Sequence, residues 1–107
     1  MNRSLDLRVE PLAALCRRFG VRRLELFGSA TTEAFVSKRS DLDFIVEFSD
    51  GAASLFDDYF GLKEALEALY GRPVDLVMAG AMRNPYFIKS VNETRRLVYA
   101  AEDAQAA

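Results

Sequence analysis

The sequence predicts an α+β fold, an α/β arrangement of two layers in which helices pack against a small mixed sheet of three to four strands. The chain has 107 residues, enough for one hydrophobic core but not for two. Along it, segments with alternating apolar residues are interleaved with segments of helical periodicity, an order typical of one sheet covered by helices. We therefore expect a single domain over residues 1–107, with an ordered core of about 8–99 and a frayed tail at 100–107.

The first quarter of the chain predicts a helix followed by a strand. Apolar residues recur at helical spacing from Val9 to Phe19, and Gly20 follows as a natural end of the helix. Residues 21–27 alternate and predict a short strand that ends at Gly28-Ser29.

The clearest strand signal lies in residues 41–48. Its alternating residues divide into an apolar face and a mixed face. The segment is apolar enough to be a central strand. The apolar face holds Leu42, Phe44, Val46 and Phe48, and the mixed face holds Asp43, Ile45 and Glu47.

Two further helices and two further strands complete the predicted order. Asn84-Pro85 is a strong helix start, because asparagine caps a first turn and proline fits the first helical position. Gly71 ends the helix before it. In chain order we expect a helix at 55–69, a strand at 73–78, a helix from 84 with Ile88 and Val91 buried, and a short strand at 97–99.

Composition excludes several classes of function. The chain has no histidine, which removes Ser-His-Asp hydrolysis, a histidine general base and the commonest zinc sites. Its net charge is −2, so we do not expect direct binding of nucleic acid. No apolar run reaches the ~20 residues of a membrane span. The single cysteine, Cys16, fits a reducing cytoplasm, where we expect the protein to reside.

Asp41 and Asp43 are the first candidates for the chemistry that remains, which must use carboxylates, hydroxyls, basic side chains or a hard metal ion. In a strand they project from the same face, with Cα atoms about 6.5–7 Å apart. Two carboxylates placed in this way repel each other unless a cation neutralises them, and Mg²⁺ typically binds one or two carboxylates together with phosphates and water. The alternative is that this Asp-x-Asp merely ends a loop, with Asp41 capping and Asp43 partly solvated.

Asp75 interrupts an apolar strand, where a buried unpaired carboxylate is costly. Its side chain points away from Val74 and Leu76, so it can share a face with Asp43 if the two strands are neighbours. Three carboxylates on one sheet face suit a two-metal site or a metal ion with a base. The alternative is an edge-strand residue that faces water.

Gly28-Ser29 is the third element of the candidate site. A strand that ends in Gly-Ser and passes into a helical turn presents backbone N–H groups and a hydroxyl, which suit a phosphate. By itself such a pair is most often just a turn, and its place upstream of the aspartates gives it weight.

Taken together, these motifs resemble the minimal nucleotidyltransferase family of the DNA polymerase β-type nucleotidyltransferase superfamily. The resemblance runs from about Arg8 to Tyr99 and implies the nucleotidyltransferase fold. The segments that carry it are Leu26-Phe27-Gly28-Ser29, Ser40-Asp41-Leu42-Asp43-Phe44-Ile45-Val46, Gly71-Arg72-Pro73-Val74-Asp75-Leu76-Val77 and Asn84-Pro85-Tyr86-Phe87-Ile88.

The resemblance implies a role for each residue of the site. Asp41, Asp43 and Asp75 would be catalytic and would bind one or two Mg²⁺ ions, with Asp75 also a candidate base for the incoming hydroxyl. Gly28 and Ser29 would contact the phosphates of the nucleotide. The implied reaction transfers a nucleoside monophosphate, AMP from ATP, to a macromolecular acceptor, with pyrophosphate as the leaving group.

The resemblance also implies a partner, because members of this family are often the antitoxins of HEPN-type toxins. Whether the chain forms homo- or hetero-oligomers is left open. Two features depart from the family pattern: eleven residues, Ala30 to Ser40, separate Gly-Ser from the first aspartate where ten are usual, and Ala30 stands where many members have arginine. Both favour an alternative function, a non-catalytic antitoxin or binding module of the same fold that acts by occluding its partner.

Overall fold

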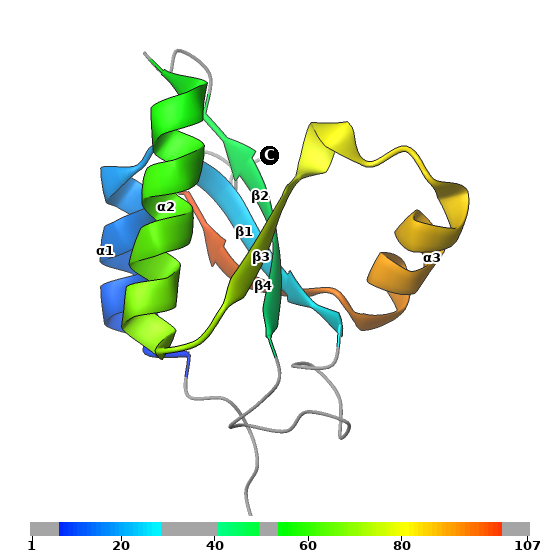
Figure 1. Ribbon diagram of the computed structural model, residues 1–107, viewed down its shortest axis with the longest axis horizontal. Coiled ribbons are helices and arrows are strands. Elements are labelled where there is room, and N and C mark those ends of the chain that lie inside the picture. The colour runs from blue at the N-terminus through cyan, green and yellow to red at the C-terminus, as the bar shows by residue number, and fades with distance from the viewer. Residues whose placement is uncertain (1–6, 29–40, 50–53, 102–107) are drawn as a thin grey trace, which may run out of the picture.

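Four strands form one open sheet with the order β3-β2-β1-β4 (Figure 1). The computed structural model describes residues 7–28, 41–49 and 54–101. β1 is antiparallel to both of its neighbours, whereas β2 and β3 run parallel. The sheet is therefore mixed, as predicted. The strands are β1 (Val21–Phe27), β2 (Leu42–Phe48), β3 (Val74–Met78) and β4 (Arg96–Ala100).

The helices lie on the two sides of this sheet. α1 (Val9–Arg18) and α2 (Leu55–Tyr70) pack side by side on one face, and α3 (Pro85–Thr94) lies on the other (Figure 1). The 3-10 turn Ala79–Ala81, which the sequence did not predict, leads from β3 toward α3. Among the described residues, no helix is both long and apolar enough to cross a membrane.

Each helix begins and ends close to the predicted residues. Ser54 caps α2, with its side-chain oxygen accepting from the backbone N–H of Asp57, and Gly71 follows the last turn. The side chain of Asn84 accepts from the N–H groups of Tyr86 and Phe87 at the start of α3. These bonds satisfy donors that a helix leaves unpaired in its first turn, which explains why the predicted starts are correct.

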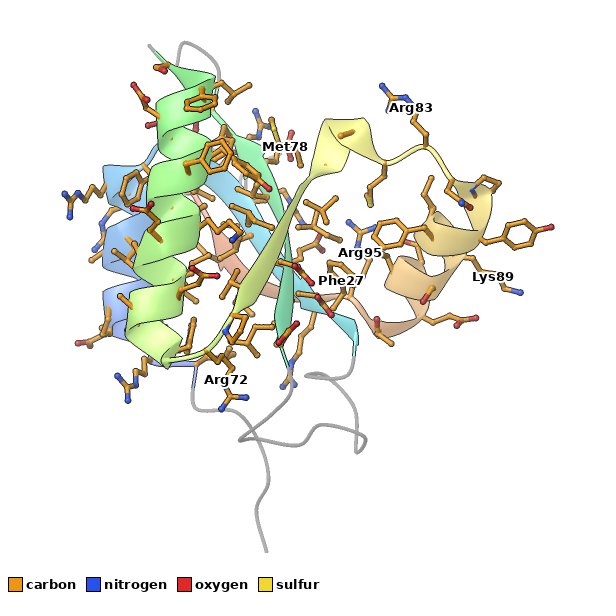
Figure 2. The ribbon with its side chains drawn as sticks, viewed as in Figure 1. Phe27, Arg72, Met78, Arg83, Lys89 and Arg95 are labelled. Carbon is orange, nitrogen blue, oxygen red and sulfur yellow. The ribbon has the colours of Figure 1, made fainter. Side chains whose placement is uncertain are left out.

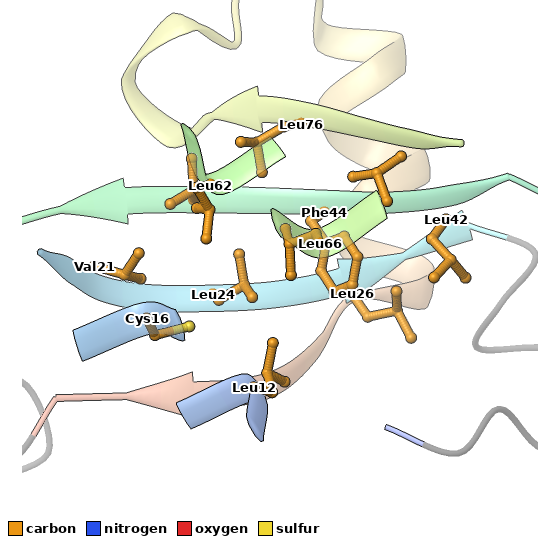
Figure 3. Packing of buried hydrophobic residues seen from close by; sticks show 12 residues of the cluster. Leu12, Cys16, Val21, Leu24, Leu26, Leu42, Phe44, Leu62, Leu66 and Leu76 are labelled. Atoms are coloured by element: carbon orange, nitrogen blue, oxygen red, sulfur yellow. The ribbon is translucent and has the colours of Figure 1, made fainter. Parts of the chain in front are cut away.

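β2 is central because both of its faces are buried. On the side of α1 and α2, Phe44 and Val46 belong to a cluster of twelve buried residues that also holds Cys16, a free thiol without exposure (Figure 3). On the side of α3, Ile45 packs with Phe27 and Val91 in a smaller cluster. The same alternation that predicted a strand thus distributes its side chains between two cores.

Gly61, inside α2, allows the two helices on the first face to approach closely. A Cβ atom at this position would lie 2.5 Å from Cε1 of the Phe19 ring. Glycine lowers the intrinsic stability of a helix, but here the space that a side chain would need is filled by an aromatic ring from the end of α1.

Candidate active site

Asp43 and Asp75 lie side by side on the sheet face that α3 partly covers. They are direct partners in the parallel pairing of β2 with β3, so their side chains project to the same face. Their carboxyl groups lie close enough to form a hydrogen bond when one of them is protonated. Asp75 is also exposed and lies on an edge strand, as the alternative interpretation of this residue predicted. The structure therefore brings these two predicted residues together.

The charge of Asp43 is disfavoured where it stands. Burial raises the pKa of its carboxyl group from 3.8 to about 6, with further contributions from the hydrogen bond to Asp75 and from the negative charges of Asp75 and Asp41. At low pH a proton relieves the repulsion between these two carboxyl groups. A hard cation with oxygen ligands is the other species that such a donor set accommodates, so the residues present fit Mg²⁺.

Asp41 stands at the same end of the sheet but apart from that pair. It immediately precedes β2 and is exposed, and the next residue, Leu42, donates its N–H to the carbonyl oxygen of Pro73 at 3.1 Å. This bond holds the beginnings of β2 and β3 together. Within residues 7–28, 41–49 and 54–101, no three carboxylate or thiol side chains gather closely enough to hold a metal ion among themselves. The metal-binding roles of Asp41, Asp43 and Asp75 stay predictions.

Gly28 follows β1 and lies against the carboxyl group of Asp43. A Cβ atom there would lie 2.6 Å from Oδ2 of Asp43, and the φ angle is 79°, so a side chain is disfavoured both by space and by backbone conformation. Its N–H donates to Oγ1 of Thr94 at 2.9 Å. Ser29 lies outside the described residues. The phosphate-binding roles of Gly28 and Ser29 therefore stay predictions. The close approach of the Asp43 carboxyl group is a separate reason for a glycine at position 28.

The last turn of α3 contributes residues that the sequence did not reveal. Thr94 is bonded to Gly28, and the Arg95 guanidinium forms a paired hydrogen bond with the Glu25 carboxylate on β1. The Glu25 side chain is only 12% exposed, so this ion pair is better shielded than a surface one. Arg95 is labelled in Figure 2. The signal was present in the sequence: Glu25 is a charge between two apolar strand residues.

Side chains of α2 bind the outer edge of β3, the strand that carries Asp75. The Glu67 carboxylate accepts from the backbone N–H of Val74 at 3.1 Å and from Lys63 at 3.3 Å, and the first of these bonds is the larger cause of its lowered pKa. The hydroxyl of Tyr59 donates to the carbonyl oxygen of Leu76. Because Val74 and Leu76 flank Asp75, their bonds fix the strand on both sides of the carboxylate and also cover an edge that could otherwise pair with another chain.

Fold and site together are those of a nucleotidyl-transferring enzyme: a small mixed sheet, a pair of carboxyl groups on two adjacent strands, the central β2 and the edge strand β3, and a glycine turn beside them. A sequence model of the nucleotidyltransferase domain matches residues 10–98. The chain belongs to the nucleotidyltransferase domain family, and the predictions of its fold and of its class of enzyme are confirmed.

Known relatives agree with this assignment. A candidate protein adenylyltransferase of Methanocaldococcus jannaschii is 38% identical over 79 residues, which are 74% of this chain and 78% of that one. The structure of a candidate minimal nucleotidyltransferase has 35% identity and a TM-score of 0.65, covering 83% of this chain and 87% of that chain. A solved structure of the tri-AMPylated HEPN toxin of Shewanella oneidensis in complex with MNT antitoxin contains a chain that is 18% identical to this one, with a TM-score of 0.60. The match covers 94% of this chain and 76% of that chain. That last likeness concerns the fold alone.

Proposed function

We propose that this chain is a Mg²⁺-dependent protein adenylyltransferase that transfers AMP from ATP to a hydroxyl group of a HEPN-type toxin and thereby acts as its antitoxin. The proposal takes residues 1–107 as one nucleotidyltransferase domain. The observation that carries it is the carboxyl pair of Asp43 and Asp75, next to which Gly28 leaves room for a close approach. The M. jannaschii relative supports the adenylyl group, and the S. oneidensis complex supports the partner.

In this mechanism the site residues share three tasks. Asp41, Asp43 and Asp75 would hold Mg²⁺, which supplies charge neutralisation at the phosphates. Gly28 and Ser29 would contact the triphosphate. The oxygen of the acceptor hydroxyl attacks the α-phosphorus, the bond from that phosphorus to the oxygen bridging to the β-phosphate breaks, and pyrophosphate leaves. Asp75, the exposed member of the pair, would take the proton of the hydroxyl.

Labelling of a co-expressed partner tests the proposal directly. With Mg²⁺ and α-labelled ATP, we expect the wild-type chain to transfer label to the toxin encoded beside it, and Asp43→Ala to reduce transfer by at least about a hundredfold. The matched control is Glu64→Gln, which removes an exposed charge on α2 away from the site. Absence of label with every nucleotide and with the co-expressed neighbour would contradict the enzymatic proposal.

The second candidate function is occlusion without catalysis. It is favoured by the separation of Asp41 from the carboxyl pair, since no three such side chains gather in the part of the chain that the structure describes. A variant with Asp41, Asp43 and Asp75 all replaced by asparagine separates the two functions. Neutralisation of the toxin by this variant would support occlusion, and its loss in a variant that still binds the toxin would support catalysis.

A further inference from the structure

The last turn of α3 reaches the candidate active site through a single side chain. α3 is anchored on β1 by the buried Val91 and by the edge-to-face contact of Phe87 with Phe27, whose ring centres are 5.7 Å apart. One turn after Val91, Arg95 pairs with Glu25. Thr94 lies between these two anchors, and its hydroxyl oxygen meets the N–H of Gly28.

The geometry of the Thr94 hydroxyl assigns it as the acceptor in this bond. Its proton can go to the carbonyl oxygens of Ser90 at 3.3 Å or Val91 at 3.5 Å within the helix. The oxygen therefore keeps its lone pairs for the N–H of Gly28 at 2.9 Å. Gly28, the residue that follows β1, is thus bonded to a side chain 66 positions away in sequence.

Gly28 is confined on two sides. Thr94 holds its N–H, and the Asp43 carboxyl group occupies the space in which a side chain would stand. These two contacts fix the Gly28 backbone relative to the carboxyl pair, and Gly28 is one of the residues proposed to contact the phosphates. Nothing in the reaction requires Thr94 to touch the nucleotide.

We propose that Thr94 is a positioning residue, whose hydroxyl fixes the Gly28 backbone at the place where Gly28 would contact the nucleotide phosphates. The expected effect on nucleotide binding rests on the proposed adenylyl transfer, whereas the fixing of the Gly28 backbone by Thr94 does not depend on it. A loss of this hydroxyl should weaken nucleotide binding, while the carboxylates and the fold stay in place.

Two variants at this position isolate the hydroxyl. Thr94→Val keeps the branched shape and removes the acceptor, whereas Thr94→Ser keeps the acceptor. We expect Thr94→Val to raise the KM for ATP by about five- to tenfold, the effect of losing one hydrogen bond, with kcat changed less than about twofold. Thr94→Ser should restore the wild-type KM to within about twofold. An unchanged or lowered KM in Thr94→Val overturns the inference.

Glu25→Gln is the matched control, because it weakens the neighbouring anchor of α3 without touching Gly28. We expect it to lower the melting temperature and to leave the KM for ATP unchanged. If it raises KM as much as Thr94→Val does, the effect belongs to the docking of α3 in general, and the role assigned to Thr94 is wrong.

Hydrogen exchange of the Gly28 amide, measured by NMR without nucleotide, separates this inference from the proposed function. We expect exchange to be at least about fivefold faster in Thr94→Val than in the wild type or in Thr94→Ser. Equal rates in the wild type and in Thr94→Val overturn the inference by themselves. Failure of the wild-type chain to bind or use any nucleotide would instead contradict the proposed function.

Discussion

The carboxyl group of Asp43 is held where its negative charge is disfavoured, although an amide or an apolar side chain would be easier to accommodate. Burial on the sheet face is the main cause that disfavours the ionised form, and the neighbouring carboxyl group of Asp75 adds to it. A sequence selected for stability alone would not keep this pair. Retention of such a destabilising group is expected where a bound cation uses it.

Asp43→Asn is therefore expected to stabilise the folded chain in the absence of divalent ions. The folded pKa of about 6 lies above the ordinary value of 3.8, so the folded state binds the proton more tightly than the unfolded state does. Stability falls as the pH rises through this interval, and the loss is complete above it. At pH 7.5 the variant should gain on the order of 1 kcal/mol, a modest amount because solvent screens a half-exposed group.

Thermal unfolding of Asp43→Asn and the wild type, in EDTA between about pH 3.5 and 7.5, measures this difference. The variant should melt roughly 4–8 °C higher than the wild type at the upper end of this pH range. The difference should disappear at the lower end, where Asp43 is protonated in both the folded and the unfolded state. Asp41→Asn, which removes an exposed charge, should give a smaller gain. A lower melting temperature for Asp43→Asn at pH 7.5 would show that the folded chain gains from this charge.

At the scale of elements, α2 holds the outer edge of β3, the strand that carries Asp75. Tyr59→Phe removes the hydroxyl that donates to Leu76 while keeping the ring, so the carbonyl group on the edge of β3 loses this bond. We expect a loss of about 1 kcal/mol in the free energy of unfolding, measured by urea denaturation. Tyr86→Phe is the control, because the Tyr86 side chain is 85% exposed. An equal effect of the two substitutions would contradict a specific role for the Tyr59 hydroxyl.

The elements themselves were predictable because their signals are local. Periodicity, the asparagine-proline start of α3 and the glycines after α1 and α2 lie within a few residues of the structure they determine. β2 was predicted to be central because its residues are apolar enough for a buried strand, and the sheet order confirms it. The short turn Ala79–Ala81 was missed, since three small residues carry neither period.

At the scale of the whole molecule, the site is a meeting of segments that are far apart in sequence. Asp43 and Asp75 were predictable as site residues because an apolar strand rarely carries a charge without a function. The pairing of β2 with β3 brings the two side chains to the same face. Thr94 and the ion pair of Arg95 with Glu25 were not predicted, because polar contacts across 66 and 70 positions leave no periodic trace. Such contacts depend on where α3 ends relative to β1, which only the assembled fold determines.

Binding of Mg²⁺ with ATP should stabilise the whole molecule if the candidate site is functional. A ligand that binds only the folded state at a hundred times its Kd adds about 2.7 kcal/mol, which for a domain of this size raises the melting temperature on the order of 10 °C. The shift should shrink below about pH 6, where the raised pKa of Asp43 lets a proton compete with the cation. It should disappear in Asp43→Asn and persist in Glu64→Gln. Since Asp43→Asn is itself expected to be more stable without ligand, a missing shift in that variant cannot be attributed to unfolding. A wild-type chain without any shift, at millimolar ATP and Mg²⁺, would leave occlusion as the function that the fold supports.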